Sequence, residues 1–169
     1  MRQENNLVDF YRNDLFNSGY HRAEKALAFA ASHHDGFRLD GSPEISHQIE
    51  IAKYLRKLIP FKGLERALIV TMLHDVREDY GVADCVIRAL FGLPVASDVA
   101  HLTKVFRGVS LPVAYAFSMP ARSPISAIVK GADRIHNLRT MDNAFSDEKK
   151  ASYRLEARRY ILPMLLKAQ

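Results

Sequence analysis

Apolar residues recur every three or four positions along most of the chain, and the strict alternation that marks a half-buried strand is nearly absent. This period predicts helices, and glycine and proline residues separate one helical pattern from the next. We expect helices over about residues 20–34, 43–58, 64–78, 83–91, 94–104, 126–143 and 146–167. The pattern therefore predicts an all-α fold, a compact single-domain bundle of six to eight helices.

The pattern over 64–78 differs from the others because it is apolar on nearly every side through "ALIVTML". A helix of this kind is typically central and buried. Residues 107–124, in contrast, contain a glycine and three prolines, so we expect an irregular connection with one short helix. Pro60 should end the helix over 43–58, and Pro163 should bend or end the last helix.

Titratable residues crowd the end of the central helix, in "LHDVREDYG". His74 and Glu78 are four residues apart, as are Asp75 and Asp79, so each pair shares one face of a helix. Burying such groups without partners is costly. One interpretation is a cluster that caps the helix and pairs with neighbouring arginines. The other is a site for Mn²⁺, Fe²⁺ or Zn²⁺, provided that the helix end lets His74 and Asp75 point the same way.

A metal site needs further ligands, and two candidates stand elsewhere in the chain. His47 lies on the inner side of the helix over 43–58, and Asp133 follows the apolar run of the helix over 126–143. Taken alone, such a histidine is usually a structural core residue. A lone aspartate usually forms a salt bridge, here with Arg134 or Arg139.

Composition narrows the class of protein. The 169 residues fit one domain, and the net charge of +5 favours an anionic ligand without indicating nucleic acid. Cys85 is the single cysteine and cannot form an internal disulfide; we expect it in the core. No signal peptide or membrane-length apolar run is visible. We therefore expect a cytoplasmic protein with no membrane partner.

The order His…His-Asp…Asp is the signature of the HD superfamily of metal-dependent phosphohydrolases. Four segments resemble, in order, the hydrolase domain of Rel/SpoT proteins: "GFRLDGSPEISHQIEIA", "LHDVREDYG", "IRALFGLPVASDVAHLTK" and "IVKGADRIHNLRTM". The resemblance covers about residues 22–166 of a single domain over 1–169, and leaves 1–20 as a poorly matched N-terminal extension. Because the chain ends soon after the last segment, it resembles the standalone small alarmone hydrolases.

The resemblance implies a role for nine residues. Four match the ligands of one divalent ion, usually Mn²⁺ in this family: His47, His74, Asp75 and Asp133. Two carboxylates match the groups that orient and deprotonate the attacking water: Glu78 and Asp79. Three match substrate contacts, at the base, near the ribose and phosphate, and beside them: Arg38, Asn137 and Thr140. The implied activity is hydrolysis of the 3′-pyrophosphate of guanosine tetra- or pentaphosphate to GDP or GTP and pyrophosphate.

The sequence departs from the family pattern at five positions that match none of the implied ligands. Lysine, tyrosine, proline, threonine and leucine are common in the family where this chain has, in that order, Leu39, Glu44, Gln48, Tyr80 and Gly131. The first two positions flank the implied base pocket. An adenosine alarmone or another small nucleotide therefore remains an alternative substrate, and a non-catalytic binding module of the same fold is a third interpretation.

Overall fold

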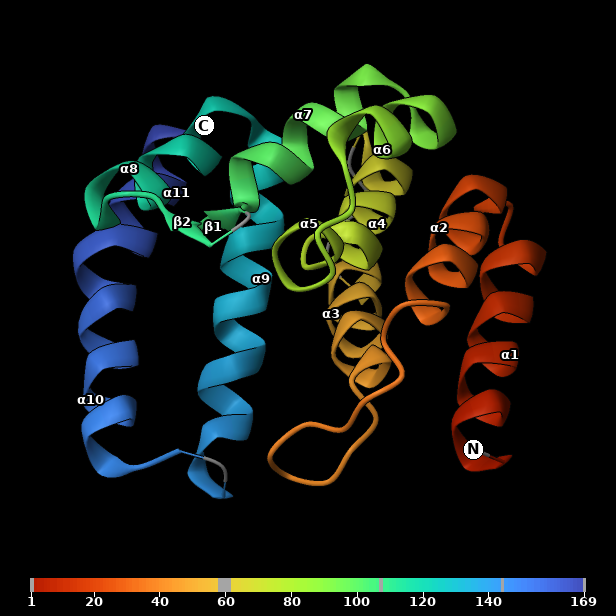
Figure 1. The fold of residues 1–169 in the computed structure, drawn as a ribbon, viewed down its shortest axis with the longest axis horizontal. Coiled ribbons are helices and arrows are strands. Elements are labelled where there is room, and N and C mark those ends of the chain that lie inside the picture. Colours follow the sequence, from red (N-terminus) through yellow and green to blue (C-terminus); the bar gives the residue numbers. More distant parts are fainter. Residues whose placement is uncertain (1, 58–61, 107, 144, 169) are drawn as a thin grey trace.

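A computed structural model describes residues 2–57, 62–106, 108–143 and 145–168, and it confirms the all-α class (Figure 1). The first half of the chain forms α1 (Arg2–Asn17), α2 (His21–Ala31), α3 (Ile45–Lys57), α4 (Leu64–Leu73), α5 (Val76–Asp79), α6 (Asp84–Phe91) and α7 (Leu93–Leu102). The second half forms β1 (Val105–Phe106), β2 (Val109–Ser110), α8 (Val113–Ser118), α9 (Pro124–Thr140), α10 (Asp147–Glu156) and α11 (Leu162–Lys167). The described residues thus divide into more helices than the six to eight expected, because two expected helices are split and α1 was not expected.

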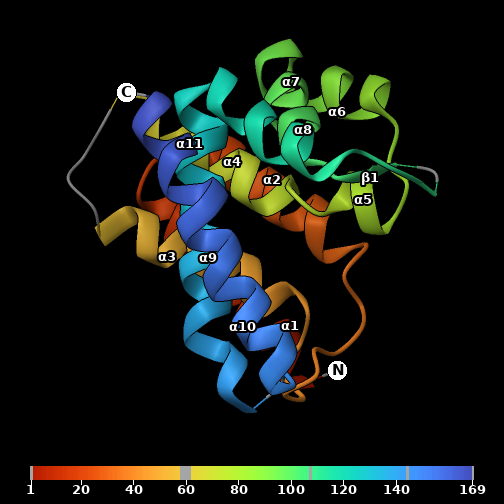
Figure 2. The same cartoon turned by 90° about the vertical axis from the view of Figure 1, so that its left-hand side faces the viewer.

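Helix α4 is the centre of the molecule, as its apolar sequence predicts. It packs against α2, α3, α7 and α9, and the side chains from Ala67 to Leu73 are all buried. Helix α9 begins with Ser123 as its cap and Pro124 in its first turn, and α10 and α11 lie along it (Figure 2). The site described below lies where α3, α4 and α9 meet.

The N-terminal extension forms a helix that the apolar pattern did not predict. Helix α1 packs against α2, and its Tyr11 and Leu15 belong to the main hydrophobic core. Its sequence is polar on average, and two of its aromatic residues, Phe10 and Phe16, are exposed, so the apolar residues do not mark one clear face. The extension is therefore part of the packed domain.

Two expected helices are interrupted. The helix expected over 64–78 is divided into α4 and α5, and His74 and Asp75 lie in the turn between them. The last helix passes through a π-helical turn, Ala157–Ile161, before Pro163 in α11. Proline lacks a backbone N–H and crowds the preceding turn, so the expected irregularity is found directly before it.

The connection expected over 107–124 contains β2, which pairs antiparallel with β1 just before it, and then α8 and a 3₁₀ turn, Met119–Arg122. Cys85 is exposed on α6, so the expectation of a core position was wrong; the helix turns its other face, with Ile87 and Phe91, inward. Leu58 and Pro60, where we expected α3 to end, lie outside the described residues. Among the helices that the structure describes, none is long and apolar enough to cross a membrane.

Candidate metal centre and active site

His74 and Asp75 face each other because α4 ends just before them. On a continuous helix, adjacent side chains point about 100° apart. In the turn between α4 and α5, the His74 Nε2 lies 2.9 Å from Asp75 Oδ2. Burial alone would lower the pKa of His74, but the Asp75 carboxylate raises it to about 9. Binding of a cation at Nε2 would therefore release this proton.

His47 on α3 and Asp133 on α9 complete a group of four side chains. Ligand atoms of His47, His74 and Asp75 lie within 4.8 Å of one another, which is close enough for one metal ion. The His47 Nε2 also lies 3.3 Å from Asp133 Oδ1. Both imidazoles and Asp133 are buried, and the Asp75 side chain is 31% exposed. Two nitrogens and two carboxylates form a donor set that suits a divalent transition metal.

A hydrogen bond fixes the tautomer of His74. The His74 Nδ1 lies 2.8 Å from the Thr71 carbonyl oxygen, which can only accept, so Nδ1 carries the proton. The His47 Nδ1 lies 2.9 Å from the His136 Nδ1, so one of these two nitrogens donates to the other. Burial, together with the neighbouring His47 and Arg38, lowers the pKa of His136 to about 4. In both histidines, Nδ1 is engaged and Nε2 is the nitrogen left for a metal.

Asp133 is surrounded by donors. The Lys130 ammonium lies 2.9 Å from its Oδ2, and both side chains are buried. The Asn137 amide donates to its Oδ1 at 2.6 Å. Burial alone would raise the pKa of Asp133, but Lys130 and His47 hold it well below its usual range. Sequence reasoning assigned no role to Lys130, although the spacing of three residues on α9 would have allowed this ion pair.

Glu78 and Asp79 lie one turn beyond Asp75, on α5. The Glu78 Oε2 accepts a hydrogen bond of 2.7 Å from the backbone N–H of Lys104, which fixes one carboxylate oxygen. The Asp79 side chain is exposed, yet partial desolvation and the negative charges of Asp75 and Glu78 raise its pKa to about 6. The Asp79 carboxylate can therefore accept a proton at a pH closer to neutral than an ordinary aspartate does.

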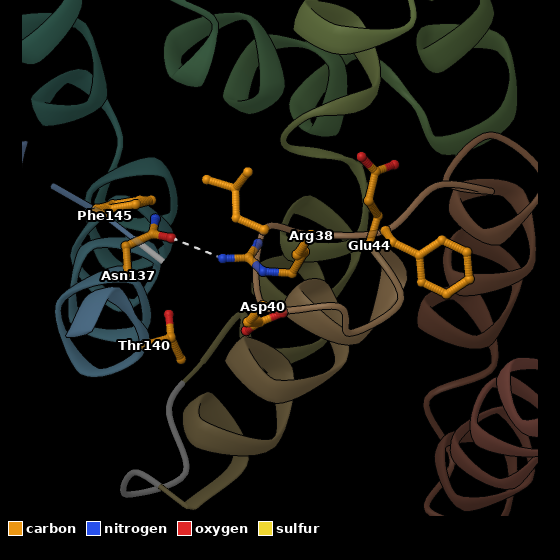
Figure 3. A pocket seen from close by; sticks show the side chains of 8 residues that line it. Arg38, Asp40, Glu44, Asn137, Thr140 and Phe145 are labelled. Carbon is orange, nitrogen blue, oxygen red and sulfur yellow. Dashed lines mark hydrogen bonds between the residues drawn. The ribbon is translucent and has the colours of Figure 1, made fainter. Parts of the chain in front are cut away.

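A cavity of about 330 Å³ opens beside this centre (Figure 3). It is lined by Phe37, Arg38, Leu39, Asp40, Glu44, Asn137, Thr140 and Phe145. Arg38 reaches across the cavity and donates to the Asn137 Oδ1 at 3.4 Å, while the other end of this amide holds Asp133. The three residues predicted to contact substrate therefore share one cavity, and Asn137 connects it to the candidate metal ligands.

Comparisons with known proteins bear on what this site is. No family model matches the chain. It is 35% identical over 149 residues to a probable guanosine-3′,5′-bis(diphosphate) 3′-pyrophosphohydrolase of Synechocystis, which covers 83% of this chain and 19% of that protein. It is 36% identical over 141 residues to a GTP pyrophosphokinase of Myxococcus xanthus, which covers 76% of this chain and 18% of the relative. The bifunctional (p)ppGpp synthase/hydrolase SpoT of Escherichia coli is 30% identical over 138 residues.

The chain thus spans about a fifth of the length of these curated relatives. A solved structure described as "A metazoan ortholog of SpoT hydrolyzes ppGpp and plays a role in starvation responses" has the same fold, with a TM-score of 0.71 at 22% identity. The likeness covers 88% of this chain and 92% of that one. The chain is an HD-type Rel/SpoT hydrolase-like domain.

Three of the departures of this Rel/SpoT-like domain from the family pattern have partners in the structure. The Tyr80 hydroxyl donates to Glu44 Oε2 at 2.6 Å, so two of the unusual residues hold each other. Gly131 lies against Leu165 of α11, and a Cβ at this position would come within 3.1 Å of that side chain. The absence of a side chain at Gly131 therefore lets α11 approach α9 closely.

The other two departures lie near the site. Leu39 lines the cavity with its side chain 75% exposed. The Gln48 amide nitrogen lies 3.1 Å from Asp75 Oδ2, a contact with a candidate metal ligand that sequence reasoning did not foresee. The only sequence signal for it was an amide on the buried face of α3, one position after His47.

Proposed function

We propose that this domain hydrolyses the 3′-pyrophosphate of guanosine tetra- and pentaphosphate in a reaction that depends on a divalent metal, giving GDP or GTP and pyrophosphate. The observation that supports this proposal most strongly is the meeting of His47, His74 and Asp75, with Asp133 beside them, in a domain related to Rel/SpoT hydrolases. The substrate comes from the names of the relatives, and the chemistry comes from the donor set of this chain.

The donor set fits a bound ion because each of the four side chains offers an atom at the common centre. His47 and His74 would bind through Nε2, since their Nδ1 atoms are engaged with His136 and Thr71. Asp75 and Asp133 would bring two negative charges. Mn²⁺ is the ion we propose. A divalent ion at this position supplies a water of lowered pKa and neutralises charge on a phosphoryl group.

Glu78 and Asp79 would act on the attacking water. Glu78 is held by the Lys104 N–H, and its second oxygen is available to orient that water. The raised pKa of Asp79 brings its proton affinity nearer to that of a general base that works at neutral pH. We propose that these two carboxylates take the proton of the water, while the metal ligands keep their own positions.

Arg38, Asn137 and Thr140 would bind the nucleotide in the cavity of Figure 3. The planar guanidinium of Arg38 suits stacking on a purine base, and Asn137 lies between that base and the ion. The Thr140 hydroxyl donates to the backbone carbonyl of His136 at 3.0 Å and can still accept a bond from the substrate.

The test is an assay with Mn²⁺ and separate panels of guanosine and adenosine 3′-pyrophosphates, with the products identified by chromatography. We expect release of pyrophosphate from the guanosine compounds. Asp75→Ala should lose both bound Mn²⁺ and turnover, whereas Glu78→Ala should lose turnover and keep Mn²⁺. A wild-type protein that binds no Mn²⁺ and releases no pyrophosphate from either panel would refute the proposal.

The adenosine panel tests the alternative substrate, because Leu39 and Glu44 line the cavity where the family usually has other residues. Preferential turnover of adenosine compounds would keep the metal mechanism and change the base. A protein that binds these nucleotides without releasing pyrophosphate would favour a non-catalytic binding module.

A further inference from the structure

Gln48 and His34 form a buried chain of hydrogen bonds that ends at Asp75. The Gln48 Nε2 lies 3.0 Å from the His34 Nε2 and 3.1 Å from Asp75 Oδ2. At the other end, the His34 Nδ1 lies 2.9 Å from the Ala30 carbonyl oxygen at the end of α2. Gln48 and His34 are 1% and 3% exposed, so water does not compete for these bonds.

The donors and acceptors in this chain of hydrogen bonds can pair in only one arrangement. Because the Ala30 carbonyl can only accept, His34 carries its proton on Nδ1 and presents a lone pair at Nε2. Burial lowers the pKa of His34, which keeps the ring neutral. The Gln48 amide therefore faces two acceptors, the His34 Nε2 and the Asp75 carboxylate, and each receives one of its two N–H groups. Rotating the amide would place its oxygen against both acceptors.

This arrangement leaves one polar atom of Gln48 buried without a partner among the described residues. This atom is the amide oxygen, Oε1. An unpaired buried amide oxygen destabilises a fold, and an apolar side chain of similar size would avoid it. The amide oxygen thus lowers the stability of the fold, while the amide nitrogen donates a hydrogen bond to the candidate metal ligand Asp75.

Two other departures from the family pattern adjoin the same chain. The ring of Tyr80 packs edge-on against His34, with centroids 4.8 Å apart, and its hydroxyl donates to Glu44. Gln48 and Tyr80 therefore both contact His34, and Glu44 holds the hydroxyl of Tyr80. Tyr80 fixes the plane of His34 from the side, and His34 fixes the plane of the Gln48 amide.

We propose that Gln48 is a positioning residue for the metal ligand Asp75, and that His34 sets the orientation of its amide. One amide N–H holds Asp75 Oδ2 in place, so the carboxylate is turned toward the centre before an ion arrives. The inference rests on the proposed metal site, and it does not depend on which nucleotide is the substrate.

The test measures Mn²⁺ affinity directly, by electron paramagnetic resonance of free Mn²⁺ titrated with metal-free protein. Gln48→Leu keeps the volume and removes the donor, and we expect its affinity to fall by about 10- to 100-fold, as is typical for partners of metal ligands. His34→Leu leaves the amide free to turn and should reduce the affinity less, in the same direction. Thr103→Val is the control: its hydroxyl is also buried, but it donates to the Val99 carbonyl, away from the candidate metal ligands.

Melting temperatures of the metal-free proteins separate positioning from general destabilisation. The proposal expects Gln48→Leu to melt at or above the temperature of Thr103→Val, yet to bind Mn²⁺ more weakly. Equal Mn²⁺ affinities in the wild type, Gln48→Leu and His34→Leu would overturn it. If Gln48→Leu does not fold, His34→Leu decides the matter in the same assay. A wild-type protein that binds no Mn²⁺ would instead overturn the metal site on which the inference rests.

Discussion

The buried ion pair between Lys130 and Asp133 makes a quantitative prediction about the metal-free fold. Their side chains are 7% and 9% exposed, and the ammonium lies 2.9 Å from the carboxylate. Lys130→Met keeps the length of the side chain and removes the charge, so Asp133 is left buried with less compensation. Removing one partner of such a pair costs about 3–5 kcal/mol. Because Asn137 and His47 also contact the carboxylate, we expect the lower end of this range.

A loss of about 3 kcal/mol should lower the melting temperature by roughly 6–12 °C for a domain of this size. The assay is thermal unfolding followed by circular dichroism, in chelator and in excess Mn²⁺. Mn²⁺ should stabilise the variant more than the wild type, because the ion replaces the missing positive charge and no longer competes with Lys130 for Asp133. A ligand at 100 times its Kd contributes about 2.7 kcal/mol. At that Mn²⁺ concentration the variant should therefore reach nearly the stability of the metal-free wild type.

Lys53→Met is the matched control. Lys53 pairs with Glu50 at 2.8 Å, also three residues apart on a helix, but with side chains 34% and 52% exposed. Pairs at the surface contribute about 0–1 kcal/mol, so this variant should melt close to the wild type in either condition. If Lys130→Met melts like Lys53→Met in chelator, or gains no more from Mn²⁺ than the wild type, the reasoning about the buried pair is wrong.

Three further variants test other parts of the structure. Arg38→Ala should raise KM for the nucleotide with little change in Mn²⁺ affinity; an unchanged KM in steady-state assays would count against stacking on the base. Tyr80→Phe keeps the ring and releases Glu44, so KM should rise while the melting temperature stays within a few degrees of the wild type. Gly131→Leu must displace Leu165, and we expect a loss of about 1–3 kcal/mol in urea unfolding; an unchanged midpoint would contradict the close packing.

The helical period predicted most of the fold because most of the helices bury an apolar face. It predicted α4 as the central helix, since "ALIVTML" has no polar side to expose. It missed α1, which is polar on average and exposes Phe10 and Phe16 while it buries Tyr11 and Leu15. It also ran α4 and α5 together, because a turn over two residues barely disturbs the period. That turn is nevertheless what brings His74 and Asp75 together.

The site was less accessible to the pattern than the fold. His74 and Asp75 were visible from the crowding of charge after an apolar run. His47 and Asp133 stood out as further candidates from their places in apolar helices, and the resemblance to a family then assigned them as ligands. The partners of these residues depend on side chains from different helices. The hydrogen bonds of Gln48 are one example, because they join His34 after α2 to Asp75 after α4. These residues are far apart in the sequence, so the helical period of one segment cannot predict the contact.

Asn137 links the cavity to the candidate metal ligands, so binding in the cavity can affect binding of an ion, and the reverse. Its amide contacts Arg38 through one atom and Asp133 through the other, so a change in the position of either neighbour alters the bond to the second. Coupling between two ligands is reciprocal: the factor by which the ion tightens nucleotide binding must equal the factor by which the nucleotide tightens ion binding. If nucleotide and ion favour the same orientation of this amide, the domain would retain its metal best when its substrate is abundant, and would release it most readily when the substrate has been consumed.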